Sequence, residues 1–478
     1  MTGMRCAALV CLFSSLLVAA ACGSSHKGNS NETGRVTIHV ITPPAGSPDP
    51  FQGLTMLHLE VRENGTLVFQ DDFGAGIPIT VNGLTAGTGR TVLLQGLETG
   101  TVVSHGMTLP FDFVTGDQLD VPLYFSRSNS FSPVHGVSSA RVGASSAAFA
   151  DGRVLVAGGL NGATGLATAL LYDPLTDILA TTGTMSTAHA FTQAVLLSTS
   201  DVLVAGGATG STGATAKAEV FAYDTATGTG VWKTGVPAMS TRRRDAAAAK
   251  FGAGFALVAG GDIGNGFPLA STEVFEWNGT TGTWTTGDPM RSPRMGAVAL
   301  AVETDTVLVA GGLNLGAEGG GSQYSRTTDI FSRGGTNATQ ADGNDLVYRA
   351  GYPGVVGIDG STWLLTGGEI DAGFTAKTET ARWTGSDVTA SQRADLPTSH
   401  RRGGGATLDD GRVIVAGGDT GTRPIVAPVD ESQIYDAGVN SFSGLGSSPG
   451  ASSIVAIYPL GDGTSVVVSD AGVMRFNP

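Results

Sequence analysis

A short hydrophobic run that ends in two glycines recurs six times along this chain of 478 residues. The glycine pairs are Gly158-Gly159, Gly206-Gly207, Gly260-Gly261, Gly311-Gly312, Gly367-Gly368 and Gly417-Gly418. The steps between the first glycines of successive pairs are 48, 54, 51, 56 and 50 residues. A nearly constant period of this length predicts a repeat architecture in which each unit is one small sheet.

The runs before the glycine pairs are apolar at consecutive positions, as in Val154-Leu155-Val156-Ala157. An alternating strand buries one face, whereas a consecutive apolar run is typical of a strand packed on both faces. We therefore expect each unit to lie between two others. The glycines are then predicted at a sharp turn beside a neighbouring sheet, where φ is positive and a Cβ atom has no room.

Each unit continues with a loop rich in Gly, Ser and Thr and then an aromatic residue. These aromatic residues are Tyr172, Tyr223, Trp277, Phe331, Trp383 and Tyr435, and two units add Trp232 and Trp284. In this pattern and in its period of about fifty residues the repeat resembles the Kelch family, whereas WD40 repeats are about 40 to 45 residues long. The resemblance implies a β-propeller over residues 129–478.

The end of the chain predicts a seventh unit without a glycine pair. Residues 454–458, 464–470 and 473–476 are expected to form its first three strands, and residues 129–134 its fourth, which would close the ring and leave no free sheet edge. We expect blades near residues 141–188, 189–242, 243–293, 294–348, 349–399, 400–449 and 450–478, the last closed by 129–134. Six blades remain the alternative if residues 451–478 pack elsewhere.

Residues 35–125 have a hydrophobic period of two, as in Val36, Ile38 and Val40, which predicts half-buried strands. Asn64-Gly65 and Asn82-Gly83 predict hairpin turns, since both central residues of such a turn need positive φ. About seven strands predict a small immunoglobulin-like β-sandwich, by strand number alone. The predicted fold class is all-β, a seven-bladed Kelch-type β-propeller preceded by this sandwich.

The first 34 residues resemble the export signal of a bacterial lipoprotein. Arg5 is followed by an apolar run from Ala7 to Ala21 and then Cys22, a pattern similar to a lipobox. The resemblance implies a signal peptide at 1–21, a lipidated Cys22 carrying palmitate, and a disordered tether at 22–34. We expect an exported protein, lipid-anchored to the outer membrane and facing the periplasm or the cell surface. An ordinary signal peptide cleaved nearby is the alternative.

The overall charge argues against one class of partner. A formal net charge of -14 leaves no basic surface for a phosphate backbone, so nucleic acid is not expected. His39 and His58 lie on the polar faces of their predicted strands without a third ligand nearby in the pattern, so we predict no metal site. The only cysteines are Cys6, Cys11 and Cys22, which excludes the crosslinked Tyr–Cys centre of Kelch copper oxidases.

Basic residues recur 17 positions before the first glycine of each pair. These positions hold Arg141, His189, Arg243, Arg294, Ala350 and His400, with Arg349 and Arg401 adjacent to the last two. One hypothesis is that Arg141, His189, Arg243, Arg294, His400 and Arg401 bind an anionic ligand at one mouth of the ring. The favoured alternative is structural, because a repeated residue in a repeat protein is first a packing residue that bonds carbonyl groups of an adjoining blade.

The fourth unit carries two long inserts, Asn314–Arg326 and Gly334–Asp345, where a rigid ring would present recognition loops. Tyr324, Arg326, Tyr348 and Tyr352 are the candidate ligand contacts there. Glu219, Glu273 and Glu379 are expected on third strands, away from the mouth, and no convergent set of acid and base groups is apparent.

We therefore predict no catalytic residue and no cofactor. The first hypothesis is a non-catalytic scaffold that presents propeller loops to a protein or polysaccharide of the cell envelope, with the membrane contacted through the lipid anchor only. The alternative is a carbohydrate-active Kelch enzyme, similar to a sugar epimerase, that acts on acidic sugars. A purely structural envelope component is the third hypothesis.

Overall fold

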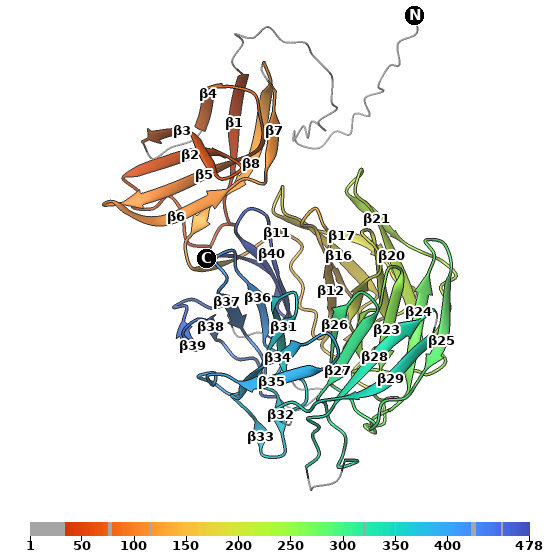
Figure 1. Ribbon diagram of the computed structural model, residues 1–478. Helices are drawn as coiled ribbons and strands as arrows, with labels where there is room; N and C mark the ends of the chain where they lie inside the picture. Colours follow the sequence, from red (N-terminus) through yellow and green to blue (C-terminus); the bar gives the residue numbers. More distant parts are fainter. Residues whose placement is uncertain are drawn as a thin grey trace, which may run out of the picture.

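The computed structural model describes residues 34–74, 79–114, 116–318, 322–335, 337–348, 350–421, 427–450 and 453–478. Within these ranges the protein consists of 42 strands, from β1 to β42, and contains no helix. Accordingly, no helix in the described part is long and apolar enough to cross a membrane. The strands form a small β-sandwich and a larger ring of sheets (Figure 1). The predicted lipidation site, Cys22, lies outside the described residues.

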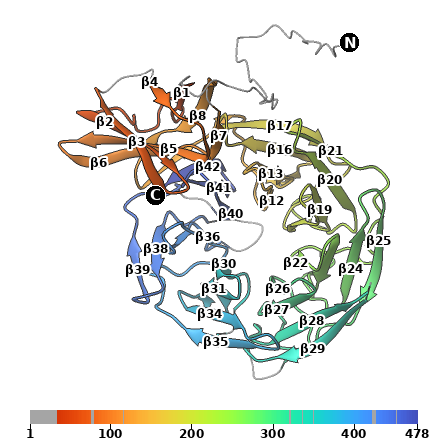
Figure 2. The same cartoon turned by 45° about the horizontal axis from the view of Figure 1, so that its top comes forward.

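The ring is built from seven sheets that share a set of four antiparallel strands (Figure 2). The first three contain β12 (Ser145–Ala148), β13 (Val154–Ala157), β16 (Thr168–Asp173) and β17 (Ile178–Thr184); β18 (Ala194–Leu196), β19 (Asp201–Ala205), β20 (Ala218–Asp224) and β21 (Thr229–Trp232); and β22 (Ala247–Lys250), β23 (Phe255–Ala259), β24 (Thr272–Trp277) and β25 (Gly282–Gly287). In each sheet the strands follow one another in chain order from the centre outwards.

The next three sheets repeat this order. They contain β26 (Val298–Glu303), β27 (Thr306–Ala310), β28 (Thr328–Gly334) and β29 (Asn337–Gly343); β30 (Gly354–Asp359), β31 (Thr362–Thr366), β34 (Thr378–Trp383) and β35 (Val388–Gln392); and β36 (Gly404–Thr407), β37 (Val413–Ala416), β38 (Ser432–Asp436) and β39 (Ser441–Gly444). Two short hairpins extend the loops after the glycine pairs: β14 (Leu160–Asn161) with β15 (Thr164–Gly165), and β32 (Glu369–Ile370) with β33 (Gly373–Phe374).

The last sheet joins the two ends of the ring. It contains β40 (Ile454–Pro459), β41 (Ser465–Ser469) and β42 (Gly472–Asn477), and its fourth strand is β10 (Ser130–Pro133) from before the first unit. β10 pairs antiparallel with β42, from Ser130 opposite Asn477 to Pro133 opposite Met474. The pairing that the sequence predicted between 129–134 and the end of the chain is thus present. A short strand, β11 (His135–Gly136), then pairs with β17 of the first sheet.

The glycine pairs sit where consecutive sheets meet. Gly158 and Gly159 both have positive φ, 69° and 93°. A Cβ atom on Gly158 would lie 2.0 Å from the carbonyl oxygen of His189 in the next sheet. The amide of Gly159 donates a hydrogen bond of 2.8 Å to that same oxygen. The conformational and steric reasons predicted for the glycines are therefore confirmed.

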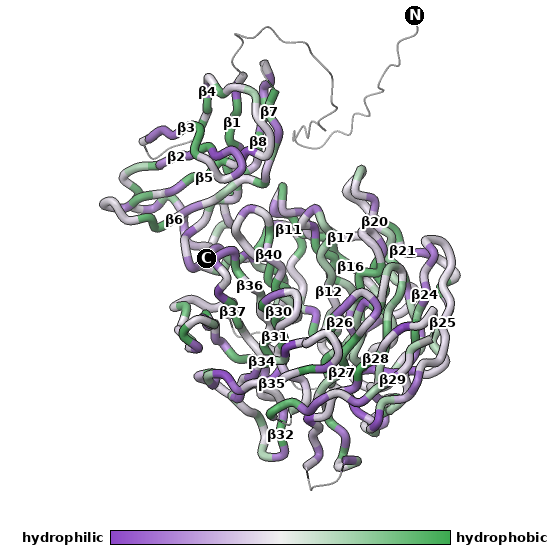
Figure 3. The backbone as a smooth tube through the Cα atoms, in the orientation of Figure 1, coloured by the Kyte–Doolittle hydropathy of each residue, from purple (hydrophilic) through white to green (hydrophobic). Residues whose placement is uncertain are grey.

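The second strand of each sheet is buried on both faces. In β13, Leu155 packs with Val202 and Val204 of the following sheet, whereas Val154 and Val156 pack with the closing sheet. This confirms the interpretation of the consecutive apolar runs, and full burial of one such side chain contributes about 1.5–3 kcal/mol. Figure 3 shows the hydrophobic stretches inside the ring and hydrophilic ones in its loops.

The N-terminal sandwich has two sheets around one core. One sheet contains β4 (Ile79–Leu84), β1 (Gly34–Ile41) and β8 (Gln118–Tyr124), and the other β3 (Thr66–Phe73), β2 (Met56–Glu63), β5 (Gly87–Glu98), β6 (Thr101–Met107) and β9 (Ser126–Arg127), with β7 (Phe111–Phe113) beside β5. Val36 and Ile38 of the first sheet and Leu57 and Leu59 of the second belong to the same buried cluster. The alternating residues therefore face inwards, as their period predicted.

One of the two predicted hairpins of the sandwich is confirmed and the other is wrong. Asn64 and Gly65 both have positive φ and join β2 to β3. Asn82-Gly83 instead lies inside β4, which continues to the buried Leu84 and shifts its register against β1 there. The reason is that the next strand, β5, belongs to the opposite sheet, so the chain has no partner to turn back to at this point.

Candidate functional site: a cavity at the centre of the ring

The centre of the ring contains a cavity of about 500 Å³. Side chains from the first strand of every sheet, or from the residues just before it, line this cavity. The strands concerned are β12, β18, β22, β26, β30, β36 and β40. A concave site of this size, in contact with all units of a rigid ring, is the kind of place where proteins bind small ligands.

Six equivalent residues form an inner ring at the cavity: Gly143, Phe191, Asp245, Gly296, Tyr352 and Arg402. All six have φ between 53° and 66°. From Phe191 onwards, the amide of each residue donates to the carbonyl oxygen of the preceding one, at 2.7–3.0 Å. The amide of Gly143 donates to the Asp470 carboxylate in the last sheet, at 2.9 Å.

Four residues of the inner ring carry side chains: Phe191, Asp245, Tyr352 and Arg402. Left-handed φ is uncommon for residues other than glycine, and here the chain of amide hydrogen bonds holds these four residues in that conformation. The two glycines of the inner ring make space for their aromatic neighbours. A Cβ atom on Gly143 would lie 2.4 Å from the ring of Phe191, and one on Gly296 would lie 2.4 Å from the ring of Tyr352. Each aromatic ring therefore lies over the glycine of the preceding unit.

Arg402 lies among the other side chains of the inner ring. Its guanidinium carbon is 5.4 Å from the centre of the Phe191 ring and 4.8 Å from that of Tyr352. Its Nη2 is 3.5 Å from Oδ1 of Asp245, which comes from the third sheet, whereas Arg402 precedes the sixth. A guanidinium has five N–H donors in a planar fork, a geometry suited to a ligand carboxylate. The side chain is 22% exposed, so a ligand in the cavity has access to it.

Further polar groups complete the lining. The hydroxyl groups of Tyr458 and Ser146 are 2.9 Å apart, and burial raises the pKa of Tyr458 to about 12. Tyr458 is therefore neutral at physiological pH. Together the cavity offers a guanidinium, carboxylates, phenols and aromatic faces, which can hold a polar ring compound and exchange protons with it.

The arginines of the predicted anion site lie elsewhere. Arg141, Arg243 and Arg294 are buried, and Nη1 of each donates to the carbonyl oxygen of the first glycine of its own sheet, at 2.8–3.2 Å. The same Nη1 donates to the carbonyl oxygen of Thr168, Ser271 or Thr327, respectively. These contacts are within the same sheet, not with an adjoining one as the structural hypothesis expected. The ligand role of these arginines stays a prediction, and they do not line the cavity.

The histidines of the predicted anion site are also buried. Nδ1 of His189 is 2.6 Å from the carbonyl oxygen of Gly206, and its Nε2 is 3.3 Å from Glu219. Burial lowers the pKa of His400. Arg401 is ion-paired with Glu369 and, at 3.0 Å, with Asp419. Their ligand role likewise stays untested, and Arg349 lies outside the described residues.

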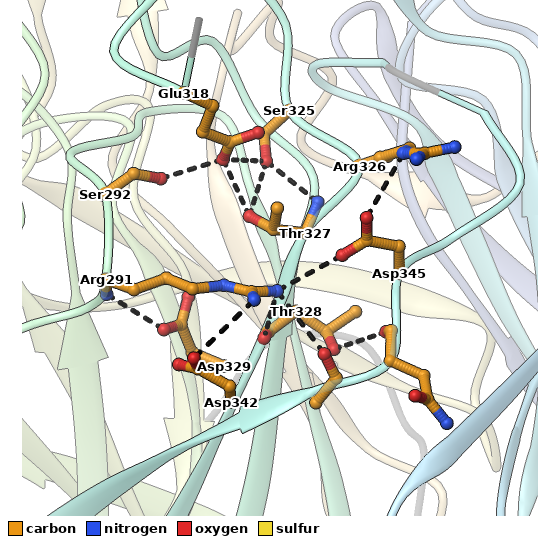
Figure 4. A network of polar contacts seen from close by, with 12 residues as sticks. Arg291, Ser292, Glu318, Ser325, Arg326, Thr327, Thr328, Asp329, Asp342 and Asp345 are labelled. Carbon is orange, nitrogen blue, oxygen red and sulfur yellow. Dashed lines mark hydrogen bonds and ion pairs between the residues drawn. The ribbon is translucent and has the colours of Figure 1, made fainter.

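The four candidate loop contacts are not brought together. Tyr352 lies in the central cavity and Tyr348 beside a smaller pocket. The hydroxyl of Tyr324 donates to Glu369 at 3.3 Å. Arg326 pairs with Asp345 at 3.2 Å on the surface (Figure 4). Of the four, the cavity therefore includes only Tyr352.

The two inserts of the fourth unit differ from each other. Gly334–Asp345 was expected to be a recognition loop, which is wrong, because most of it forms β29 and pairs with β28. The first insert is tied to the fourth sheet through Glu318, which accepts hydrogen bonds from Ser292, Ser325 and Thr327 at 2.5–2.8 Å (Figure 4). The hydroxyl groups of Ser292, Ser325 and Thr327 are therefore hydrogen-bonded within the protein.

Phe191, Asp245 and Arg402 were not among the site residues predicted from the sequence. A signal was nevertheless present, because these residues and Gly143, Gly296 and Tyr352 all lie 15 positions before a first glycine, two residues after the recurring basic positions. The identity of the residue varies from unit to unit at this position. Variation at an equivalent position of a rigid repeat is what a specific site requires, whereas constancy marks packing.

No family model and no curated protein sequence matches this chain. Among solved structures, the chain is similar to one described as a novel fungal alcohol oxidase with catalytic diversity among the AA5 family, in complex with copper. The TM-score is 0.54 at 17% identity, over 73% of this chain and 76% of that one. A second match, YjhT, has a TM-score of 0.42 at 16% identity, over 63% of this chain and 94% of that one.

The residues of the cavity do not fit a copper ion like the one bound to the alcohol oxidase. Its described lining contains Asp245, Asp470, Tyr352 and Tyr458 but neither His nor Cys, the ligands that copper prefers. No group of three or more His, Cys, Asp or Glu side chains elsewhere in the described ranges could hold a metal ion.

The comparison corrects the functional prediction made from the sequence. The non-catalytic scaffold is contradicted, because a solved structure that shares the fold is an alcohol oxidase, and the alternative on acidic sugars is the hypothesis carried forward. At 17% identity the likeness itself establishes the fold alone. The chain therefore has an all-β fold of the Kelch-type β-propeller class.

Proposed function

We propose that this protein is an enzyme that interconverts epimers of an acidic sugar by acid–base catalysis in the central cavity. The observation that carries the proposal is the position of Arg402, 5.4 and 4.8 Å from the ring centres of Phe191 and Tyr352 and 3.5 Å from the Asp245 carboxylate. Arginine binds a carboxylate through two parallel hydrogen bonds, and aromatic faces pack against the apolar face of a sugar ring. Asp245 supplies a base beside that anchor.

The reaction proposed is exchange at the anomeric carbon. Asp245 takes the proton of the anomeric hydroxyl while the bond between that carbon and the ring oxygen breaks. The phenol of Tyr352 gives its proton to the ring oxygen, which leaves an open-chain carbonyl compound. Rotation of the carbonyl group and the reverse proton transfers close the ring on the other face, so no oxidant and no net proton is consumed.

The experiment compares a uronic acid with the neutral sugar of the same configuration. Exchange between the two anomeric proton signals of glucuronic acid and of glucose is measured by NMR exchange spectroscopy. We expect the protein to accelerate exchange of glucuronic acid well above the buffer rate and to act weakly on glucose. Arg402→Gln should raise KM for glucuronic acid because the carboxylate anchor is lost, and Asp245→Asn should lower kcat because the base is lost.

The matched control is Arg412→Gln, since Arg412 is a surface arginine that pairs with Asp410 and does not line the cavity. Its rates should equal those of the unmodified protein. Equal exchange rates with and without protein, for every uronic acid tried, would refute the proposal. Equal acceleration of glucose and glucuronic acid would refute the part assigned to Arg402.

We also propose that the seven sheets are the blades of one Kelch propeller, that the sandwich is immunoglobulin-like, and that Cys22 anchors the protein to the outer membrane. The ring geometry and the lipobox-like sequence before Cys22 support these assignments. Labelling of the expressed protein with a palmitate analogue, lost in Cys22→Ala, tests the anchor. Fractionation with the outer membrane tests its location.

A further inference from the structure

Four of the sheets carry a buried carboxylate at the same place, the second residue of the third strand. These residues are Glu219 of β20, Glu273 of β24, Asp329 of β28 and Glu379 of β34. Each accepts a backbone amide from the segment that leads into its sheet, at 2.7–2.9 Å. The shared amide bond shows that the four positions are structurally equivalent.

Three of these carboxylates face a basic residue of their own sheet. Glu219 faces His189 at 3.3 Å, Glu273 faces Arg243 at 2.9 Å, and Asp329 faces Arg294 at 2.7 Å. In the fifth sheet the basic position holds Ala350, so Glu379 has a neutral methyl group where its counterparts have a basic side chain. Lys377, two residues away, pairs with Asp395 at 2.7 Å instead.

The backbone acceptors of a guanidinium are retained in the fifth sheet. In the third sheet Nη1 of Arg243 donates to the carbonyl oxygens of Gly260 and Ser271, which are themselves joined by a hydrogen bond from Gly260 to Ser271 of 3.1 Å. The equivalent pair here is Gly367 and Lys377, joined in the same way at 2.9 Å. The same two carbonyl groups are therefore present, without the arginine.

A small pocket occupies this place. It is lined by Ala350, Glu379, Tyr348, Lys377 and Gly367, among others, and has a volume of about 10 Å³. That is room for one water-sized group, so a guanidinium group enters only when the side chains of Tyr348 and Lys377, which line the pocket, move outwards. The Tyr348 hydroxyl is buried there without a hydrogen-bond partner in the described part of the chain. Burial also raises the pKa of Glu379 to about 7, as expected for a carboxylate without an ion-paired cation among the described residues.

We propose that this pocket binds a guanidinium group supplied from outside the fifth sheet, with one nitrogen between the Gly367 and Lys377 carbonyl groups and another on Glu379. The ligand class is an alkylguanidinium, either a free small molecule or the arginine side chain of a peptide. The pocket shares only Pro353 with the lining of the central cavity, and the inference does not rest on the proposed enzyme activity. An occupant would replace the cation that Arg243 and Arg294 provide in their sheets.

The test is thermal unfolding at about pH 8, where a carboxyl group with a pKa near 7 is ionised. Millimolar methylguanidinium is compared with methylammonium and sodium chloride at equal ionic strength. We expect a saturable rise in Tm with methylguanidinium only, because a ligand that binds the folded state alone raises its stability. An arginine-containing peptide should give the same rise if the pocket admits a side chain, whereas a response to methylguanidinium alone assigns it to small molecules.

Two variants test whether the rise in Tm arises from binding at this pocket. Glu379→Gln should abolish the response, and Ala350→Arg should raise the Tm of the free protein and abolish the response, because it restores the missing guanidinium. A rise of equal size in Glu379→Gln, or no rise in the unmodified protein, would overturn the proposal. A response that appears only in Arg349→Gln would also overturn it, since the chain would then supply its own guanidinium.

Discussion

The carbonyl oxygen of His189 accepts a hydrogen bond of 2.8 Å from the amide of Gly159, across the boundary between the first and second sheets. The preceding residue, Gly158, is in contact with the same oxygen, and four further glycine pairs repeat the hydrogen bond at 2.7–2.9 Å. The repeated glycines of the sequence are thus the points at which one sheet is joined to the next.

A side chain at Gly158 should therefore weaken the ring. We expect Gly158→Ala to lower the free energy of unfolding by about 3 kcal/mol, since it combines a positive φ with a backbone clash. Urea unfolding measures the change. Gly162→Ala is the matched control, because Gly162 also has positive φ but has open space around it, and it should cost about 1 kcal/mol. Equal losses would mean that the contact with His189 contributes nothing.

Arg475 in the closing strand is the second testable position. It is buried, ion-paired with Asp462, and donates to the hydroxyl of Tyr172 in the first sheet at 3.1 Å. Arg475→Met leaves the Asp462 carboxylate without its partner and should lower the free energy of unfolding by about 3–5 kcal/mol. Urea unfolding is again the measurement.

The control for Arg475 is Arg412→Met. Arg412 also pairs with an aspartate, Asp410, but both side chains are about half exposed. An exposed pair contributes about 0–1 kcal/mol, so this variant should unfold almost as the unmodified protein does. If the two substitutions have the same effect, the buried contacts of Arg475 do not stabilise the junction between the last sheet and the first.

The ring of sheets could be predicted from the sequence because residues close together in the chain specify each sheet. Val154-Leu155-Val156-Ala157 and the glycines after it specify a doubly packed strand and its end without reference to distant residues. The turn at Asn64-Gly65 is predictable for the same reason. Asn82-Gly83 is the same dipeptide, but whether the chain forms a hairpin there depends on the sheet to which β5 belongs. Tertiary packing decides that, so the local sequence does not predict it.

The cavity could not be predicted from local pattern. Asp245 and Arg402 are 157 residues apart, and only closure of the ring brings them within 3.5 Å. The recurrence of basic residues pointed instead to Arg243, two residues before Asp245. Arg243 is buried and donates to two backbone carbonyl groups. In a repeat protein the constant residue holds the unit together, and the varying residue beside it faces the shared cavity.

The raised pKa of the buried Glu379 predicts a pH dependence of stability. Its pKa is raised from 4.5 to about 7, so between these values the folded state binds a proton that the unfolded state has released. The free energy of unfolding should therefore fall as the pH rises from about 4.5 to about 7 and level off above that. Urea unfolding at a series of pH values measures this slope for the unmodified protein and for Glu379→Gln.

The glutamine variant isolates that contribution, because it keeps the size of the side chain and removes its titration. Asp395 and Lys377 nearby are paired with each other and remain the same in both proteins. The difference between the two stability curves should appear only across this pH range. Parallel curves would show that Glu379 ionises normally in the folded state.

The pKa values of two histidines of the sandwich should differ from the ordinary value of 6.5 in opposite directions. The Asp72 carboxylate, 2.6 Å from Nδ1 of His58, raises the pKa of His58, whereas burial lowers the pKa of His105. His58 thus stabilises the fold below about pH 6.5, and this contribution is lost as the pH rises through its folded pKa. NMR titration of the ring protons measures both values. Asp72→Asn should lower the pKa of His58 and leave that of His105 unchanged; a shift of both would mean that the substitution disturbs the sandwich and not one ion pair.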